Sequence, residues 1–309
     1  MKKKTEDFNY SDFLRLMIER FPLINDIQQL SFDEIKNHPV LSETQEYINS
    51  VTESSIDKIV SETFSGKNIF ESKRFETEEA KTLLFTYNLC ETMNNILARL
   101  YNPYPEEQAI YFKLMVSGLH QFRGIVSLYL SGCEFSILSS FRTLYENMLV
   151  FKFLAAHKDL IPAYNDHANI EYLKLDKGFK NETESAKIDQ AIKTITDKYS
   201  NIKGFDTPYG WARSVYPDIH NLTPIYTELG YESYSPIYFL ACDFIHSSAL
   251  AVNASNQSDA DLVFIKPFLD SAMKFLFEHI LTLLDNISIP KSTFFILVRL
   301  VANYYSKLK

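Results

Sequence analysis

The sequence predicts an all-α protein: a multi-helix bundle with long central helices and a smaller N-terminal helical segment. Apolar residues recur every three or four positions along almost the whole chain, which is the period of an amphipathic helix. The 309 residues include only 8 glycines, and no stretch alternates apolar and polar residues as a strand does. Aromatic residues make up 14% of the chain and provide broad surfaces for packing helices together.

The N-terminal part differs from the rest in its charge. Between Phe21 and Ala80 the chain has 12 acidic and 5 basic residues, so this segment carries −7 of the total charge of −8. A polar amphipathic helix with a thin apolar side is expected over residues 42–64. The sequence therefore predicts an acidic N-terminal helical segment over residues 1–75 and a main helical domain over residues 76–309.

The main domain begins with longer and more apolar helices. Gly118 and Gly124 fall in the middle of one of them, which predicts that another helix packs closely there. Pro105 and two acidic residues after it are typical of a helix start. The expected helices cover residues 78–102, 103–132, 133–157, 161–176 and 182–200.

A long segment without helical periodicity follows, over residues 201–220. It contains two glycines, two prolines and the only tryptophan of the chain, Trp211. Loops of this length inside a domain are usually functional or disordered, and the aromatic residues favour a packed loop. After it we expect a short helix that ends at Gly230, a helix over residues 238–252 and two C-terminal helices.

Charge and targeting signals limit the partners of the chain. A negative chain is a poor general binder of nucleic acid, although the part outside the acidic segment is close to neutral and leaves room for a local basic pocket. The N-terminus has lysines but no apolar core of a signal peptide. The apolar run over residues 294–302 is too short to span a bilayer and contains Arg299. We expect a cytoplasmic protein with no membrane partner.

Several kinds of site have no signature in the sequence. Cys90, Cys133 and Cys242 are far apart in apolar stretches and are expected to be core thiols in a reducing compartment. No CxxC or ExxH pair is present, so we expect no metal. The motifs of dinucleotide-binding proteins, P-loop enzymes and serine hydrolases are also missing, and we expect no cofactor.

Two ionisable residues stand out in the apolar stretch YFLACDFIHSSALAV. Asp243 and His246 are three residues apart, so they are neighbours on a helix. A carboxylate beside an imidazole can hold its tautomer and raise its basicity, as a general base requires. A buried pair that only locks two helices together is an equally good interpretation, because buried ionisable groups must be paired in any role.

A second pair lies in the most apolar helix. Arg142 and Glu146 are four residues apart in SSFRTLYENMLVF, in the order that is less favourable for a surface ion pair. We expect Asp243 and His246 to complete their hydrogen bonds and form one buried cluster. A core network that fixes the register of the helices is the alternative.

One further spacing is formally that of a nuclease. Arg213 and His220 are separated by six residues, as in the R-x(4–6)-H motif of the HEPN RNases, where the motif lies on a helix. Here Pro217 falls between the two residues and the surroundings are loop. We interpret the spacing as a coincidence.

The helix ILSSFRTLYENMLVFKFLAAH resembles the LxRxxxE helix of an uncharacterised bacterial family, catalogued as domain of unknown function 5677. Members of that family also have a Trp-containing loop and a Tyr-rich approach to a helix with S-x-x-x-H, and LGYESYSPIYFLACDFIH is similar. The resemblance covers about residues 80–285 and implies motif positions at Arg142, Glu146, Trp211, Tyr238 and His246. Cys242 stands where the pattern has serine. The family implies no activity, but its helical make-up is similar to that of bacterial phage-defence and toxin proteins.

Two hypotheses of function follow. In the first, a pocket cleaves a phosphodiester of RNA or of a nucleotide, in a defence or stress role. Its catalytic residues are Arg142, Glu146, Asp243 and His246, and its ligand-contacting aromatic residues are Trp211, Tyr238 and Tyr164. In the second, the chain is a non-enzymatic interaction module, either alone or as a homodimer, in which the cluster is structural and the acidic N-terminal segment faces a protein partner.

Overall fold

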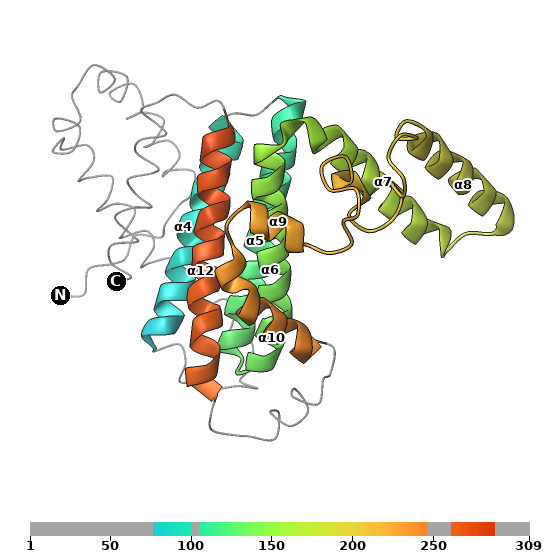
Figure 1. The fold of residues 1–309 in the computed structure, drawn as a ribbon. Coiled ribbons are helices and arrows are strands. Elements are labelled where there is room, and N and C mark those ends of the chain that lie inside the picture. The colour runs from blue at the N-terminus through green and yellow to red at the C-terminus, as the bar shows by residue number, and fades with distance from the viewer. Residues whose placement is uncertain (1–76, 101–104, 246–260, 288–309) are drawn as a thin grey trace, which may run out of the picture. The chain divides into compact units, whose positions relative to one another are not determined.

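A computed structural model describes residues 77–100, 105–245 and 261–287 of the chain. All regular secondary structure within these ranges is helical, and no strand is found there, which confirms the predicted all-α fold (Figure 1). The predicted N-terminal segment over residues 1–75 and the last predicted helix lie outside the described residues. No helix within the described ranges is both long and apolar enough to cross a bilayer.

The chain divides into two compact units, which are described separately. The first, here called the bundle unit, takes in the described residues up to Met148 and from Ile237 onward. The second, here called the hairpin unit, covers Leu149–Pro236. The described residues of both units fall inside the predicted main domain, and its expected boundary near residue 75 stays a prediction.

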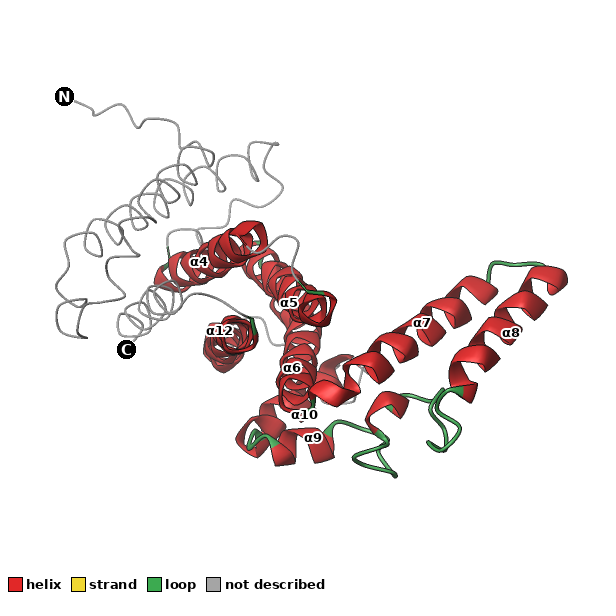
Figure 2. Cartoon of the chain, turned by 90° about the horizontal axis from the view of Figure 1, so that it is seen from above, coloured by secondary structure: helices red, strands yellow, loops and turns green. Residues whose placement is uncertain are grey.

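The bundle unit is built from long helices packed side by side. Figure 2 looks nearly along the axes of α5, α6 and α12, and α12 packs against both α4 and α5. The unit contains α4 (Glu78–Leu100), α5 (Glu106–Leu130), α12 (Asp261–Asn286), and most of α6 (Glu134–Ala156) and α10 (Ser235–Ile245).

Aromatic rings fill the core of the bundle unit. Phe141 on α6 is fully buried and meets the rings of Phe268 and Phe275 on α12 at centroid distances of 5.1 and 5.6 Å. Phe122 on α5 is also fully buried. Burial of each such side chain contributes about 1.5–3 kcal/mol, so these rings hold the helices together.

Gly118 explains how closely α5 and α12 approach each other. A Cβ atom at this position would lie 2.7 Å from the Cδ2 and Nε2 atoms of His279, so only glycine fits. The fully buried His279 ring contacts the Phe275 carbonyl oxygen through Nδ1, at 2.7 Å, and Oδ1 of Asn147 through Nε2, at 2.8 Å. The helix packing that was predicted from Gly118 is confirmed.

The hairpin unit is organised around two helices that lie side by side, α7 and α8 (Figures 1 and 2). The side chain of Asn181 accepts a hydrogen bond from the backbone N–H of Glu184 at 3.0 Å, and the Glu184 side chain accepts one from Asn181. This capping box fixes where the second helix begins. The unit contains η2 (Lys158–Leu160), α7 (Ile161–Lys177), α8 (Glu182–Asp197), η3 (Gly210–Ala212), α9 (Thr223–Glu228) and η4 (Glu232–Tyr234).

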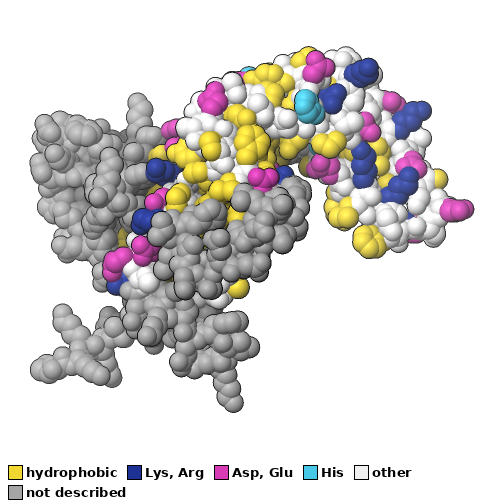
Figure 3. All heavy atoms as spheres, turned by 60° about the horizontal axis from the view of Figure 1, so that its bottom comes forward, with side chains coloured by type: hydrophobic (Ala, Val, Ile, Leu, Met, Phe, Trp, Pro, Cys, Tyr) yellow, Lys and Arg dark blue, Asp and Glu magenta, His cyan; other side chains and the backbone are white. Residues whose placement is uncertain are grey.

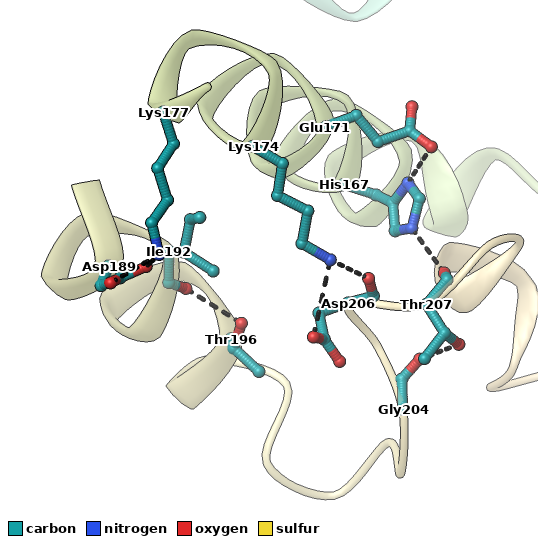
Figure 4. A network of polar contacts seen from close by, with 10 residues as sticks. All are labelled: His167, Glu171, Lys174, Lys177, Asp189, Ile192, Thr196, Gly204, Asp206 and Thr207. Carbon is teal, nitrogen blue, oxygen red and sulfur yellow. Dashed lines mark hydrogen bonds and ion pairs between the residues drawn. The ribbon is translucent and has the colours of Figure 1, made fainter. Parts of the chain in front are cut away.

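The segment over residues 201–220 is a packed loop, as predicted. Phe205 is fully buried and Trp211 is only 4% exposed. Gly210 is required for this packing, because a Cβ atom there would lie 2.0 Å from the carbonyl oxygen of Phe205. Figure 4 shows how α7 holds the loop: Nε2 of His167 lies 2.8 Å from the carbonyl oxygen of Thr207.

We expect Gly118→Ala to lower the melting temperature of the protein. Overpacking of a tight contact costs about 1–3 kcal/mol, which exceeds the roughly 0.5–1 kcal/mol that alanine gains over glycine in a helix. Gly124→Ala, on the same helix, is the control, because its Cβ would meet only the Ser140 hydroxyl at 3.2 Å, and that side chain can rotate away. Equal melting temperatures for the two variants, measured by circular dichroism, would contradict the close packing at Gly118.

Candidate functional site

The predicted pair on α6 forms a half-buried ion pair. Arg142 and Glu146 are one helical turn apart, and Nε of Arg142 donates to Oε1 of Glu146 at 2.9 Å. The two side chains are 27% and 26% exposed, so they lie at the edge of the core rather than inside it. The expectation that this pair is deeply buried is therefore wrong.

Helix α10 adds Tyr238 to this pair from 92 residues further along the chain. The Tyr238 hydroxyl donates to Oε1 of Glu146 at 2.8 Å, and the Arg142 guanidinium carbon lies 5.9 Å from the centre of the Tyr238 ring. The buried ring of Tyr145 supports Tyr238 at a centroid distance of 5.3 Å. We call Arg142, Glu146 and Tyr238 the α6–α10 cluster.

The pKa values of Tyr238 and Arg142 in the α6–α10 cluster are both raised. Burial, together with the hydrogen bond and the charge of Glu146, raises the pKa of Tyr238 well above its usual value. Burial alone would lower the pKa of Arg142, but the hydrogen bond and charge of Glu146 outweigh it and raise that pKa. Tyr238 is therefore a neutral hydrogen-bond donor and Arg142 a fixed cation at physiological pH.

Cys242 lies one turn after Tyr238 on α10 and is half-buried. Burial raises the pKa of its thiol, while the Arg142 charge and the Tyr238 hydroxyl act in the opposite direction. The net effect favours the thiol over the thiolate, and the thiolate is the nucleophile. This arrangement does not favour a nucleophilic role at the position where the resembling family has serine.

Asp243 does not take part in the α6–α10 cluster. Its side chain is exposed, which contradicts the prediction that it is buried. The prediction assumed that an apolar helix is buried on all sides, whereas Phe239 and Ile245 on α10 are themselves 51% and 37% exposed. Five residues on a helix correspond to about 140° of rotation, so Asp243 points away from the side on which Tyr238 lies. His246 lies outside the described residues.

Trp211 and Tyr164 are brought together in the hairpin unit. Their rings form an edge-to-face contact at a centroid distance of 5.1 Å, and Phe153 meets Trp211 at 5.9 Å. Burial, with a smaller contribution from the charge of Glu171, raises the pKa of Tyr164. Both residues serve as core packing within this unit, and their predicted contact with a ligand stays a prediction.

The hairpin unit contains a second polar cluster, centred on the carboxylate of Glu228, that the sequence did not reveal. Oε1 of Glu228 lies 2.7 Å from Nε2 of His157, and the Tyr216 hydroxyl donates to Oε2 of the same carboxylate. Burial tends to raise the pKa of Glu228, but the hydrogen bonds from Tyr216 and His157 prevail and lower it. Burial and Glu228 raise the pKa of Tyr216 to about 12. No local pattern could have found this set, because His157 and Glu228 are 71 residues apart.

The remaining candidates have structural explanations. Arg213 donates to the carbonyl oxygens of Lys203 and Ile219, at 3.1 and 3.3 Å, and so ties the loop together. His220 is exposed, and its Nδ1 lies 2.9 Å from the carbonyl oxygen of Asp218. These contacts agree with the interpretation of the Arg213–His220 spacing as a coincidence.

The sequence predicted that all three cysteines lie in the core, and this prediction is wrong for Cys133. Cys90 is buried, but Cys133 is exposed because it occupies the turn between α5 and α6. Within the described ranges, no three His, Cys, Asp or Glu side chains gather in a way that could hold a metal ion.

These features define an all-helical protein with a half-buried Arg–Glu–Tyr cluster between two helices. Residues 108–261 match the model of the Family of unknown function (DUF5677), which confirms the resemblance predicted from the sequence. The matched stretch includes both sides of the α6–α10 cluster, Trp211 and His246, and it is shorter than the expected span of about residues 80–285. Comparisons with curated proteins and with solved structures gave no match.

We expect Tyr238→Phe to lower the free energy of unfolding by about 1 kcal/mol, because a hydrogen bond to a partly hydrated carboxylate contributes roughly that much. The measurement is urea unfolding of this variant, of Glu146→Ala and of the double variant. The two changes should not add, since both remove the same hydrogen bond. Tyr172→Phe, at an exposed tyrosine, is the control. Strictly additive effects would show that the Tyr238–Glu146 bond contributes nothing to stability.

We expect Glu228→Gln to make the protein less sensitive to acid. The pKa of Glu228 in the folded protein is below its usual value of 4.5. The ionised carboxylate therefore stabilises the fold above pH 4.5. This stabilisation is lost as the pH falls from 4.5 through the pKa of the folded state. The difference in melting temperature between pH 7 and pH 4 should therefore be smaller in Glu228→Gln than in the wild type. Glu232→Gln, at an exposed carboxylate nearby, should behave as the wild type does.

Proposed function

We propose that this chain is a cytoplasmic bacterial enzyme that cleaves a phosphodiester of RNA or of a nucleotide, in a defence or stress role. The observation that supports this proposal is the α6–α10 cluster, in which a solvent-reaching arginine lies beside a neutral tyrosine hydroxyl and is oriented by a carboxylate. A cation, a neutral hydrogen-bond donor and an orienting anion are groups that phosphoryl chemistry uses.

Arg142 would bind the phosphate. Its planar guanidinium matches the geometry of phosphate oxygens, and its charge is permanent. Glu146 fixes the guanidinium plane through Nε at 2.9 Å, and the Tyr238 ring lies against it. A side chain already held in one orientation loses less entropy when it binds a ligand, so this anchoring favours recognition of an anion.

The proton transfers would involve residues of α10 and the sequence that follows. Tyr238 stays a neutral hydroxyl because its pKa is raised, and it would donate to a developing oxyanion only by turning its single proton away from Glu146. His246, predicted from the sequence, would take a proton from the attacking hydroxyl and return it to the leaving oxygen. Asp243, which is exposed, would act only by orienting His246.

One observation favours the alternative, a non-enzymatic interaction module. A single oxygen of Glu146 accepts hydrogen bonds from both Arg142 and Tyr238, and thereby connects α6 to α10. A purely structural network would make the same connection. In this alternative the acidic N-terminal segment would face the protein partner, and deletion of residues 1–75 would abolish binding.

We expect Arg142→Ala to lower cleavage or binding of a labelled single-stranded RNA by ~100-fold or more, as loss of one charge-stabilising donor commonly does. Arg142→Lys should recover only part of the activity, because lysine keeps the charge but lacks the planar fork. The control is Arg123→Ala, at an exposed arginine on α5.

The melting temperature of each variant separates the two functions. A folded Arg142→Ala protein without activity supports the enzyme. A sharply lowered melting temperature together with no RNA or nucleotide activity in the wild type supports the interaction module.

A further inference from the structure

One large aromatic side chain beside the α6–α10 cluster faces solvent. Phe239 directly follows Tyr238 on α10 and is 51% exposed. The two rings meet edge to face, at a centroid distance of 5.6 Å and an angle of 61°. This contact holds the Phe239 ring next to the cluster, while the rest of the ring stays accessible to a ligand.

Phe239 does not belong to an apolar face that another protein would cover. Within the described residues, the other exposed large apolar side chain of α10 is Ile245, and it lies about 120° of rotation away around the helix. Asp243, which is exposed, lies one turn after Phe239 on the same side. An isolated ring with a carboxylate beside it offers too little apolar area for a protein interface, whereas it matches the size of one flat ligand ring.

A cation lies within reach of the same ligand. The guanidinium carbon of Arg142 is 5.9 Å from the centre of the Tyr238 ring, and the centre of the Phe239 ring is 5.6 Å from it. Because Arg142 and Phe239 both lie next to Tyr238, one nucleotide can bridge them, with its phosphate on the guanidinium and its base on the ring. The opposite orientation is unfavourable, since Asp243 would repel a phosphate beside Phe239.

The charges of the described surface favour a ligand that does not depend on backbone contacts alone. Figure 3 shows basic and acidic side chains interspersed over the face that it draws. Backbone binding of a long strand requires several uncompensated cations, and the α6–α10 cluster offers one arginine that is paired with Glu146 at 2.9 Å. Further affinity therefore has to come from another kind of contact, and stacking of a base on an aromatic ring is such a contact.

We propose that Phe239 is the platform on which an unpaired base stacks, in the ligand whose phosphate Arg142 binds. The ligand class is therefore a free nucleotide, or a nucleotide at an unpaired position of an RNA strand. A base inside a duplex is stacked between its neighbours and reaches the ring only if it is extruded, which costs free energy. This inference rests on the phosphate binding proposed for Arg142, and it does not require cleavage.

Isothermal titration of the full chain with adenosine monophosphate and with ribose phosphate tests the stacking, because the two compounds differ only in the base. We expect the wild type to bind adenosine monophosphate ~10-fold or more tightly than ribose phosphate, as one base–aromatic contact commonly contributes. Phe239→Ala should bind the two compounds equally, with its affinity for ribose phosphate unchanged. Phe239→Leu keeps an apolar side chain but has no aromatic face, so it should behave as Phe239→Ala does. Phe239→Trp should retain the preference for the base.

The matched control is Ile245→Ala, at an exposed apolar residue of the same helix, and it should leave both affinities unchanged. Equal binding of the two compounds by the wild type, or equal behaviour of Phe239→Ala and Ile245→Ala, would overturn the stacking and leave the phosphate site at Arg142 standing. If the wild type binds neither compound, the phosphate site and the stacking fail together. If the base preference depends on Phe239 but the wild type cleaves no RNA, only the proposed reaction fails.

Competition identifies the source of the base. A short single-stranded RNA and the duplex of the same sequence are each added to the complex with adenosine monophosphate. Displacement by the single strand alone assigns the site to unpaired RNA, and displacement by neither assigns it to free nucleotides. Equal displacement by both would overturn the requirement for an unpaired base.

Discussion

Helix α6 has to bury one side completely while it carries an arginine and a glutamate four residues apart. Phe141, Leu144, Tyr145 and Met148 are all inaccessible to solvent, so close packing leaves α6 only one rotation about its axis. That rotation places the charged pair at the edge of the core. A half-buried carboxylate is stabilised by nearby donors, and the hydroxyl of Tyr238 is one of them. The position of α10 in the bundle unit therefore depends on how α6 is packed.

Within the described residues, each unit contains a glutamate that is shared by a basic side chain and a tyrosine. Glu146 is shared by Arg142 and Tyr238, and Glu228 is shared by a histidine and Tyr216. In both cases burial and the carboxylate raise the pKa of the tyrosine. Each tyrosine is thus a permanent donor, and each glutamate joins segments that are distant in the chain. Polar connections of this kind specify which elements meet, whereas apolar packing is more permissive.

The helices could be predicted from the sequence because their signals are local. Periodicity, the proline before α5 and the glycine at position 118 gave the helices and one close approach between them. The resemblance to the matched family also singled out Arg142, Glu146 and Tyr238, which the structure brings together. The resemblance could not predict the hydrogen bond between Tyr238 and Glu146. These residues are 92 positions apart in the chain, and the bond depends on how their two helices are rotated about their axes.

The exposure of individual side chains was harder to predict from the sequence than the positions of the helices. Asp243 and Cys133 have apolar neighbours in the sequence, yet one lies on an exposed side of its helix and the other in a turn. Burial of a residue is decided by the elements that pack over it, and the sequence of one helix does not contain that information. The Glu228 cluster is hidden for the same reason, since its members come from three separate segments.

The single tryptophan of the chain lies in the hairpin unit, at the centre of a cluster of rings. Its fluorescence emission therefore reports the solvation of that unit alone, whereas the far-ultraviolet signal averages over every helix. Comparison of the two signals during denaturation distinguishes a protein whose halves melt together from one whose halves melt independently, without any label or mutation.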